Sequence, residues 1–406
     1  MASPVRTVTK SKTATSRWAL VRYVLSAALA RTADAGAAIG LLLLAVERSS
    51  QVDRPVLAGS ILAAAIGVPH LAGPLVARVL DRARDSCQVL VAAMVAYGVF
   101  LGAAALLLGR APLALVVLLV AGAGLCGPLL TGGLSSRLAG IIGGAERAQR
   151  RGEGWDALTY GLSGSVGPAV VAAIAAGSSA LAALFVLVGG ALVGAVLTLT
   201  LPRAAAAEKT SPDAGSTAEV LQEIFRIGAL RRISVATMIT SLATGGLAVL
   251  AVRLAEHLEI SAASGATMMA AFGIGTLLGS LALTLRPLSS DPERVMLWGV
   301  TGIGVTVAAC AAAGSLPAAL VLFFLVGVMH APYLAGSLGA RSDYAPPDAR
   351  AQVFVTVAAL KIVTGAAGAP LVGLLSGLDP RIVFVGCGVL VLVGALTSVL
   401  DRRLTR

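Results

Sequence analysis

Long apolar runs, interrupted by short polar segments, make up most of this chain. Each run has roughly 18–25 residues, enough for a helix to cross about 30 Å of hydrocarbon. The pattern predicts twelve membrane spans, at residues 22–46, 55–77, 88–108, 112–134, 155–176, 180–201, 232–253, 262–284, 295–313, 316–340, 352–374 and 381–400. The fold class it indicates is an all-α integral membrane protein.

One long polar segment separates these spans into two sets of six. Residues 203–230 include EKTSPDAGSTAEVLQE and are expected to form a cytoplasmic linker. The predicted organisation is therefore a tail at 1–21, a first half at 22–202, the linker, a second half at 231–400 and a tail at 401–406.

Composition agrees with a membrane protein, because 13% of the residues are charged and soluble domains have about 25%. The net charge of +11 is a topology signal. With the N-terminus inside, the inner segments hold 24 of the 31 Lys and Arg residues and the outer loops hold five. The positive-inside rule then places both termini in the cytoplasm. The basic balance indicates a neighbouring anionic lipid bilayer and no nucleic acid partner.

An internal repeat relates the two halves. GSILAAAIGVPHLAGPL (59–75) and GATMMAAFGIGTLLGSL (265–281) are identical at 7 of 17 positions. GPLLTGGLSSR (127–137) and APYLAGSLGAR (331–341) are identical at 5 of 11 positions. Both matches pair a span with the sixth span after it. This predicts two parallel six-helix repeats around a central cavity.

These features together resemble the major facilitator superfamily, and two local motifs extend the likeness. ARVLDRARD (77–85) is similar to its cytoplasmic motif G-x-L-A-D-R-x-G-R-K, with Asp81 and Arg82 at the motif's Asp and Arg. The resemblance implies that Asp81 helps to latch a gate on the cytoplasmic side. Within this stretch, five other positions of that motif differ: Ala77, Val79, Leu80, Arg84 and Asp85.

The fifth span is similar to the superfamily's antiporter motif, G-x8-G-x3-G-P-x2-G-G, although Val171-Ala172 stand in place of its final glycine pair. In GEGWDALTYGLSGSVGPAVVA, Gly154, Gly167 and Pro168 are in register, and Ser163 replaces the second glycine. Gly-Pro in mid-membrane permits a helix kink and a close helix approach. In one interpretation the kink takes part in coupling transport to a second ion. In the other it serves only to pack the helices.

Charged residues within spans are the main candidates for function. Arg31 and Asp34 lie on one side of the first span, about 4.5 Å apart in rise. A central charge costs about 2.5–3.5 kcal/mol, so such residues usually line a cavity or pair. In the resembled fold this helix lines the cavity. We therefore expect Asp34 to carry a proton, with Arg31 as its electrostatic partner or an anion contact; a self-neutralising pair is the alternative.

Lys361 lies near the middle of the eleventh span. Together with Arg31 and Asp34 it would give the cavity a charge of +1, which favours an anionic or zwitterionic substrate. The alternatives are that Lys361 snorkels to the interface or pairs with Asp34 for folding.

Other polar residues in the spans are weaker candidates. His70 and His330 could relay protons, although hydrogen-bonded packing histidines are more common. The remaining residues that could line the cavity are Tyr160, Tyr333, Thr240 and Thr244. Membrane Ser and Thr side chains often bond only to their own helix.

The resemblance implies a secondary transporter of the cytoplasmic membrane, working by alternating access, and it leans toward drug or metabolite exporters of actinobacterial type. We expect proton-coupled efflux of a small organic molecule by a monomeric antiporter. The alternatives are an uptake symporter or facilitator, and a non-transporting membrane sensor. The sequence lacks a P-loop and metal-ligand spacing, so we expect no enzyme, cofactor or metal.

Overall fold

A computed structural model describes residues 17–73, 85–138, 146–202, 224–285, 291–345 and 350–404, with a few single residues between them. The described residues form helices and no strand. They contain twelve helices long and apolar enough to cross a membrane, which confirms the predicted count and the all-α membrane class.

The first half contains six spans, two of which end in a different helix type. They are α1 (Arg17–Glu47), α2 (Pro55–Gly67) with the 3₁₀ segment η1 (Val68–Ala72), α4 (Ser86–Leu107), α5 (Leu113–Pro128) with the π-helical segment η2 (Leu129–Gly133), α7 (Glu146–Gly177) and α8 (Ala180–Leu199). Pro69 has no N–H to donate, and α2 changes to η1 at this point.

The second half repeats this order. Its spans are α10 (Gly228–Gly245) with α11 (Leu247–His257), α12 (Ala263–Leu285), α13 (Pro292–Ala309) with η3 (Cys310–Ala312), α14 (Leu316–Tyr344), α15 (Arg350–Leu374) and α16 (Pro380–Leu404). Most of the predicted linker, residues 203–221, lies outside the described residues.

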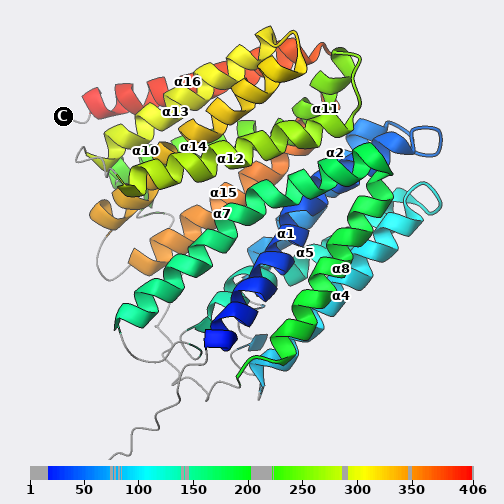
Figure 1. Ribbon diagram of the computed structural model, residues 1–406. Coiled ribbons are helices and arrows are strands. Elements are labelled where there is room, and N and C mark those ends of the chain that lie inside the picture. Colours follow the sequence, from blue (N-terminus) through cyan, green and yellow to red (C-terminus); the bar gives the residue numbers. More distant parts are fainter. Residues whose placement is uncertain are drawn as a thin grey trace, which may run out of the picture.

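The two halves form two bundles that meet at one end (Figure 1). The chain enters α1 and leaves α16 on the same side of the molecule, which we call the termini side. The opposite side, where α2 and α11 lie close to each other, we call the far side. The bundles diverge toward the termini side.

The repeated glycines mark equivalent contacts in the two halves. A Cβ at Gly59 would lie 2.8 Å from Leu42 Cα on α1, and a Cβ at Gly265 would lie 2.9 Å from Val252 Cα on α11. In each half, therefore, a glycine of the second span touches the first span. Because the same contact recurs, the sequence repeat reflects a structural repeat.

The seam between the halves follows the same symmetry. Gly67 of α2 packs against Ala366 of α15, with 3.6 Å between a built Cβ and the alanine methyl. A Cβ at Gly273 of α12 would lie only 2.6 Å from the carbonyl oxygen of Gly164 on α7. The second span of each half thus contacts the fifth span of the other.

Ion pairs hold the second half together on the termini side. Arg232 of α10 donates to Glu293 of α13 (2.6 Å) and to Asp401 of α16 (3.2 Å), and Arg402 donates to Asp291 (2.7 Å). Partial burial raises the pKa of Asp291, but the Arg402 guanidinium and the Glu293 amide outweigh it and hold that pKa below its ordinary value of 3.8. These charges connect helices of one half, so they stabilise that half as a body.

Candidate functional site

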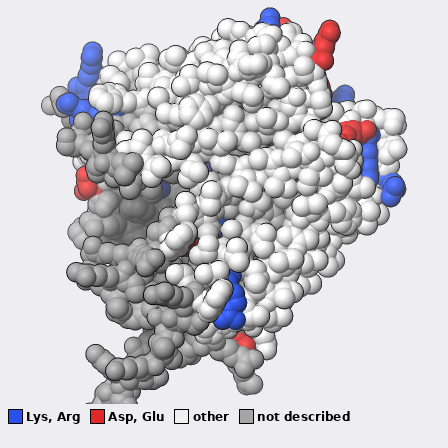
Figure 2. Space-filling view, in the orientation of Figure 1, with Lys and Arg blue, Asp and Glu red and all other residues white. Residues whose placement is uncertain are grey.

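The space between the diverging halves opens on the termini side. Figure 2 shows a described surface that is mostly uncharged, with most of the visible Lys, Arg, Asp and Glu side chains near its edges. Charge inside an otherwise apolar helical bundle is costly. The charged residues of the spans therefore identify the site.

Arg31 of α1 forms a dense polar network with α7 and the end of α5. Its guanidinium donates to the Asp156 carboxylate at 2.8 Å, to Ser135 Oγ at 2.8 Å and to the Thr159 hydroxyl. The centre of the guanidinium lies 3.6 Å from the centroid of the Tyr160 ring. Arg31 is 2% exposed, so this network compensates for its burial.

Asp156 has both carboxylate oxygens occupied. Oδ1 accepts from Arg31 and from the Tyr23 hydroxyl at 2.5 Å, and Oδ2 accepts from Ser135 at 2.8 Å. The pair is thus neutral as a unit and held by side chains from three spans. This corrects the expected link between Arg31 and Asp34, because the ion-pair partner of Arg31 is Asp156.

Asp34 instead faces His70 of η1. Asp34 Oδ2 lies 3.5 Å from His70 Nε2, and the two side chains are 18% and 19% exposed. The other ring nitrogen, Nδ1, is 3.1 Å from the Ile66 carbonyl oxygen, an acceptor that takes a hydrogen from it. Nε2 is thereby left facing the carboxylate.

The histidine occupies space that a glycine provides. A Cβ at Gly127 of α5 would lie 2.2 Å from His70 Nε2, closer than non-bonded atoms approach. His70 lines a cavity of about 350 Å³ together with Thr131, Ser136 and Ile362 of α15. The Asp34–His70 pair is therefore next to a space shared by both halves.

Lys361 of α15 faces the second half. Its Nζ lies 5.7 Å from the centroid of the Tyr333 ring, and among the described residues it has neither a hydrogen bond nor an ion pair. It does not pair with Asp34. Asp156 adds a negative charge and the buried Arg341 of α14 adds a positive one to the three charged residues counted from the sequence, so the cavity charge of +1 stays a prediction.

Comparison with known proteins agrees with this architecture. A sequence model of the Major Facilitator Superfamily matches residues 233–405. This match covers the second half of the chain and less than half of the whole sequence. Curated protein sequences gave no significant match.

Several solved transporters share the fold of this chain over nearly their whole length. The nucleoside transporter NupG superposes with a TM-score of 0.75 at 13% identity, covering 94% of this chain and 99% of that one. A bacterial homolog of the human lysosomal transporter Spinster, inward-facing and unoccupied, gives 0.70 at 14% identity and covers 95% and 96%. The peptide transporter POT with sulfate gives 0.72 at 13% identity, covering 94% of each chain. The chain therefore has the fold of these transporters, and its twelve long apolar helices are those of a multi-pass membrane protein.

The antiporter-like segment of α7 packs against α1, the helix that carries Arg31 and Asp34. A Cβ at Gly167 would lie 2.7 Å from the Gly36 backbone nitrogen, two residues beyond Asp34. Ser163 Oγ donates to the Thr159 carbonyl and so stays within its own helix. Gly154 lies in the first turns of α7, and its surroundings are outside the described residues, as are Asp81 and Arg82 of the gate motif.

The other polar candidates are mostly bonded within or between helices. Thr244 Oγ1 donates to the Thr240 carbonyl at 2.8 Å. His330 stacks edge-on against Phe272 and Tyr333, with centroid distances of 5.6 and 5.0 Å. Among the described residues, no group of three or more His, Cys, Asp and Glu could hold a metal ion.

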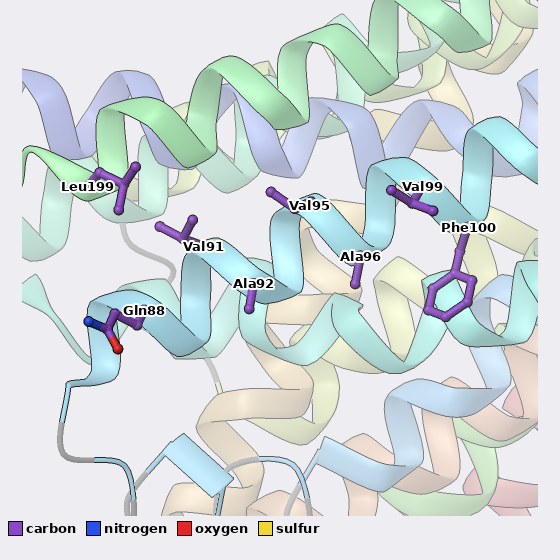
Figure 3. Close-up of a pocket in the computed structure, with 8 residues that line it drawn as sticks. All are labelled: Gln88, Val91, Ala92, Val95, Ala96, Val99, Phe100 and Leu199. Carbon is purple, nitrogen blue, oxygen red and sulfur yellow. The ribbon is translucent and has the colours of Figure 1, made fainter.

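A larger groove of about 500 Å³ lies on the outer face of α4, away from these charges (Figure 3). Its wall is apolar apart from Gln88, and Val99 and Leu199 are each about 60% exposed. Such a surface is what a membrane helix presents to lipid. The larger volume of this groove therefore does not make it the candidate functional site.

Asp156 is the functional residue that the sequence analysis did not select. It falls at the edge of the predicted fifth span, where acids are common, whereas α7 begins nine residues before that span. The longer helix carries Asp156 to the level of Arg31. The signal that could have identified it is the polar series Asp156, Thr159, Tyr160 and Ser163 on one helical face.

Proposed function

We propose that this chain is a proton-coupled exporter of a small organic molecule in the cytoplasmic membrane, with Asp34 and His70 as its proton-exchange site. The observation that carries the proposal is the geometry of this pair. Nδ1 of His70 gives its hydrogen to the Ile66 carbonyl, so Nε2 and Asp34 Oδ2, 3.5 Å apart, face each other as two acceptors. One proton between them makes the contact favourable.

The two acids of the first half then have different tasks. Asp156 is saturated by donors from Arg31, Tyr23 and Ser135, so it holds the helices together. The described residues give the Asp34 carboxylate a single partner, His70, beside a cavity. A proton can therefore enter or leave the Asp34–His70 pair without dismantling a larger network.

Alternating access supplies the direction. The two bundles diverge toward the termini side (Figure 1), which the positive-inside rule assigns to the cytoplasm. In the proposed cycle, cargo enters from the cytoplasm and leaves outside. A proton taken up outside by the Asp34–His70 pair then returns with the empty carrier and is released inside.

The test uses inverted membrane vesicles energised to an acid interior, with a pH-sensitive dye and a panel of antibiotics, dyes and metabolites. We expect at least one compound to release protons in wild-type vesicles and Asp34→Asn to abolish that response while membrane insertion is unchanged. Asp53→Asn removes an exposed acid of a far-side loop and is the matched control. Full proton release in Asp34→Asn, or none in the wild type across the panel, contradicts the proposal.

A further inference from the structure

The charges that face the space between the halves are unequally distributed. The first half contributes the acids Asp34 and Asp156, with Arg31 bound to the latter. In the described part of the second half, acids occur only at helix ends, whereas two cations, Lys361 of α15 and the buried Arg341 of α14, lie within the spans and close enough for their charges to interact. Arg341 donates to Ser337 at 2.6 Å, so Lys361 is the cation of this pair without a polar partner among the described residues.

Lys361 has no built counter-charge. The structure gives its ammonium no hydrogen bond or ion pair within the described residues, only the Tyr333 ring at 5.7 Å. A cation at that distance gains about 0.5–1 kcal/mol at an exposed site, less than the roughly 2.5–3.5 kcal/mol that a central lysine costs. By contrast, Arg31 of the same fold has an ion-pair partner and acceptors for both of its terminal nitrogens, Nη1 and Nη2. Among the described residues, the cost of burying Lys361 is not offset in this way.

Polar groups surround the same position on α10 and α14. The Tyr333 hydroxyl is 3.5 Å from Ser241 Oγ, and the Ser337 hydroxyl is 3.4 Å from Thr237 Oγ1. Ser241 is adjacent to α15, because a Cβ at Gly365, one turn after Lys361, would lie 3.6 Å from its carbonyl oxygen.

Thr240, the neighbour of Ser241 on α10, has a buried hydroxyl that no described group satisfies. The whole residue is fully buried. Buried hydroxyls without a partner are rare and call for an explanation. An anion held at Lys361 could accept a hydrogen bond from this wall as well as from the ammonium.

We propose that Lys361 binds an anionic group of the cargo, so that the transported molecule is a small organic acid. This inference rests on the proposed transport function and specifies its substrate class. The acid places its carboxylate or phosphonate at the second half. The bound carboxylate or phosphonate neutralises the Lys361 ammonium. A cargo molecule turned the other way would place its negative group near Asp34 and Asp156 of the first half, which repel it.

The strength of this contact follows from its chemistry. A hydrogen bond to a charged group contributes about 1.5–3 kcal/mol. Replacing Lys361 by Met, which keeps the length of the chain and removes the charge, should therefore weaken binding of an acid roughly 10- to 150-fold. Lys361→Arg keeps the positive charge and should preserve the preference for acids.

The experiment measures binding to the purified full chain in detergent by thermal shift, without a proton gradient. The probes are pairs of aromatic and aliphatic carboxylates and phosphonates with their neutral amides or esters. We expect some acids, and not their neutral partners, to stabilise the wild-type chain and Lys361→Arg, with the effect lost in Lys361→Met. Arg381→Met, at the far-side start of α16, is the control for removal of a cation.

Two results would overturn the inference. One is equal stabilisation by acids and their neutral partners, or by none of the acids. The other is acid binding that Lys361→Met leaves unchanged, as expected of a lysine that only snorkels. The binding assay needs no proton flow, so its result does not depend on Asp34. If acids bind but no proton-coupled flux is found, the proposed coupling is refuted and the role of Lys361 is not. If a neutral compound is transported with proton coupling, the role of Lys361 is refuted and the coupling is not.

Discussion

Gly127→Ala should uncouple the transporter without removing any titratable group. The new Cβ would lie 2.2 Å from Nε2 and 2.3 Å from Cε1 of His70. Ordinary contact begins at 3.4 Å, so the ring edge has to withdraw by about 1.2 Å. The imidazole is the free end of its side chain and can rotate, whereas α5 is packed against α2 and cannot easily shift.

The size of the effect follows from the ion pair that this movement breaks. Opposite unit charges 3.5 Å apart attract with about 1 kcal/mol in water and about 5 kcal/mol at an effective dielectric constant of ~20. Each 1.4 kcal/mol is roughly a factor of ten. Because Asp34 and His70 are partly exposed, we expect a fall in proton-coupled flux of at least about tenfold.

The assay compares Gly127→Ala with Gly132→Ala in inverted vesicles, using dye dequenching by a transported compound. A Cβ at Gly132, in η2 of the same span, meets no atom within 4 Å, so it adds a methyl group without moving His70. We expect Gly132→Ala to keep wild-type coupling. Equal coupling in both variants, with both inserted in the membrane, would refute the argument that the position of His70 matters.

Two further predictions concern the frame around the site. Gly273→Ala places a Cβ 2.6 Å from the Gly164 backbone and should push the halves apart at the seam, so that a membrane-impermeant thiol reagent labels an engineered far-side cysteine more readily. Gly164→Ala is the control, because its Cβ meets no atom within 4 Å and should not change the labelling. Equal labelling of the two variants would contradict this steric argument. For Asp291, the lowered pKa means that its stabilisation is present at neutral pH and is lost as the pH falls below 3.8. The melting temperature of the wild type should therefore exceed that of Asp291→Asn at pH 7 and approach it as the pH falls through the lowered pKa of Asp291. A difference that does not change with pH would show that ionisation plays no part.

Hydrophobic length and repeated glycines carry enough information to predict the frame. A span must be apolar over its whole length, so the twelve runs could be counted. The contacts of Gly59 and Gly265 follow from the 206-residue offset between them, since small residues in membrane helices mark close approaches. Helix ends were harder to predict, because α7 continues in polar residues beyond the apolar core.

Partners across helices could not be read from the sequence. Arg31 and Asp34 are three residues apart, and spacing alone favours their pairing. In the folded chain each finds a better partner on another span, Asp156 and His70. Which residue of a distant span lies at the same depth depends on helix tilt and rotation, which packing decides. Lys361 could be selected as a candidate from the sequence because an intramembrane charge is exceptional wherever it pairs, and its role stays a prediction.

Gradient-driven transport by Asp34→Asn tests the central claim most directly. Wild type and variant would be reconstituted into proteoliposomes, and two fluxes of the same labelled compound measured: exchange without a pH gradient, and accumulation driven by an imposed one. The account predicts that Asp34→Asn retains exchange, because the Arg31–Asp156 network that joins the helices is intact, and loses accumulation. Accumulation equal to that of the wild type would show that protons are carried elsewhere.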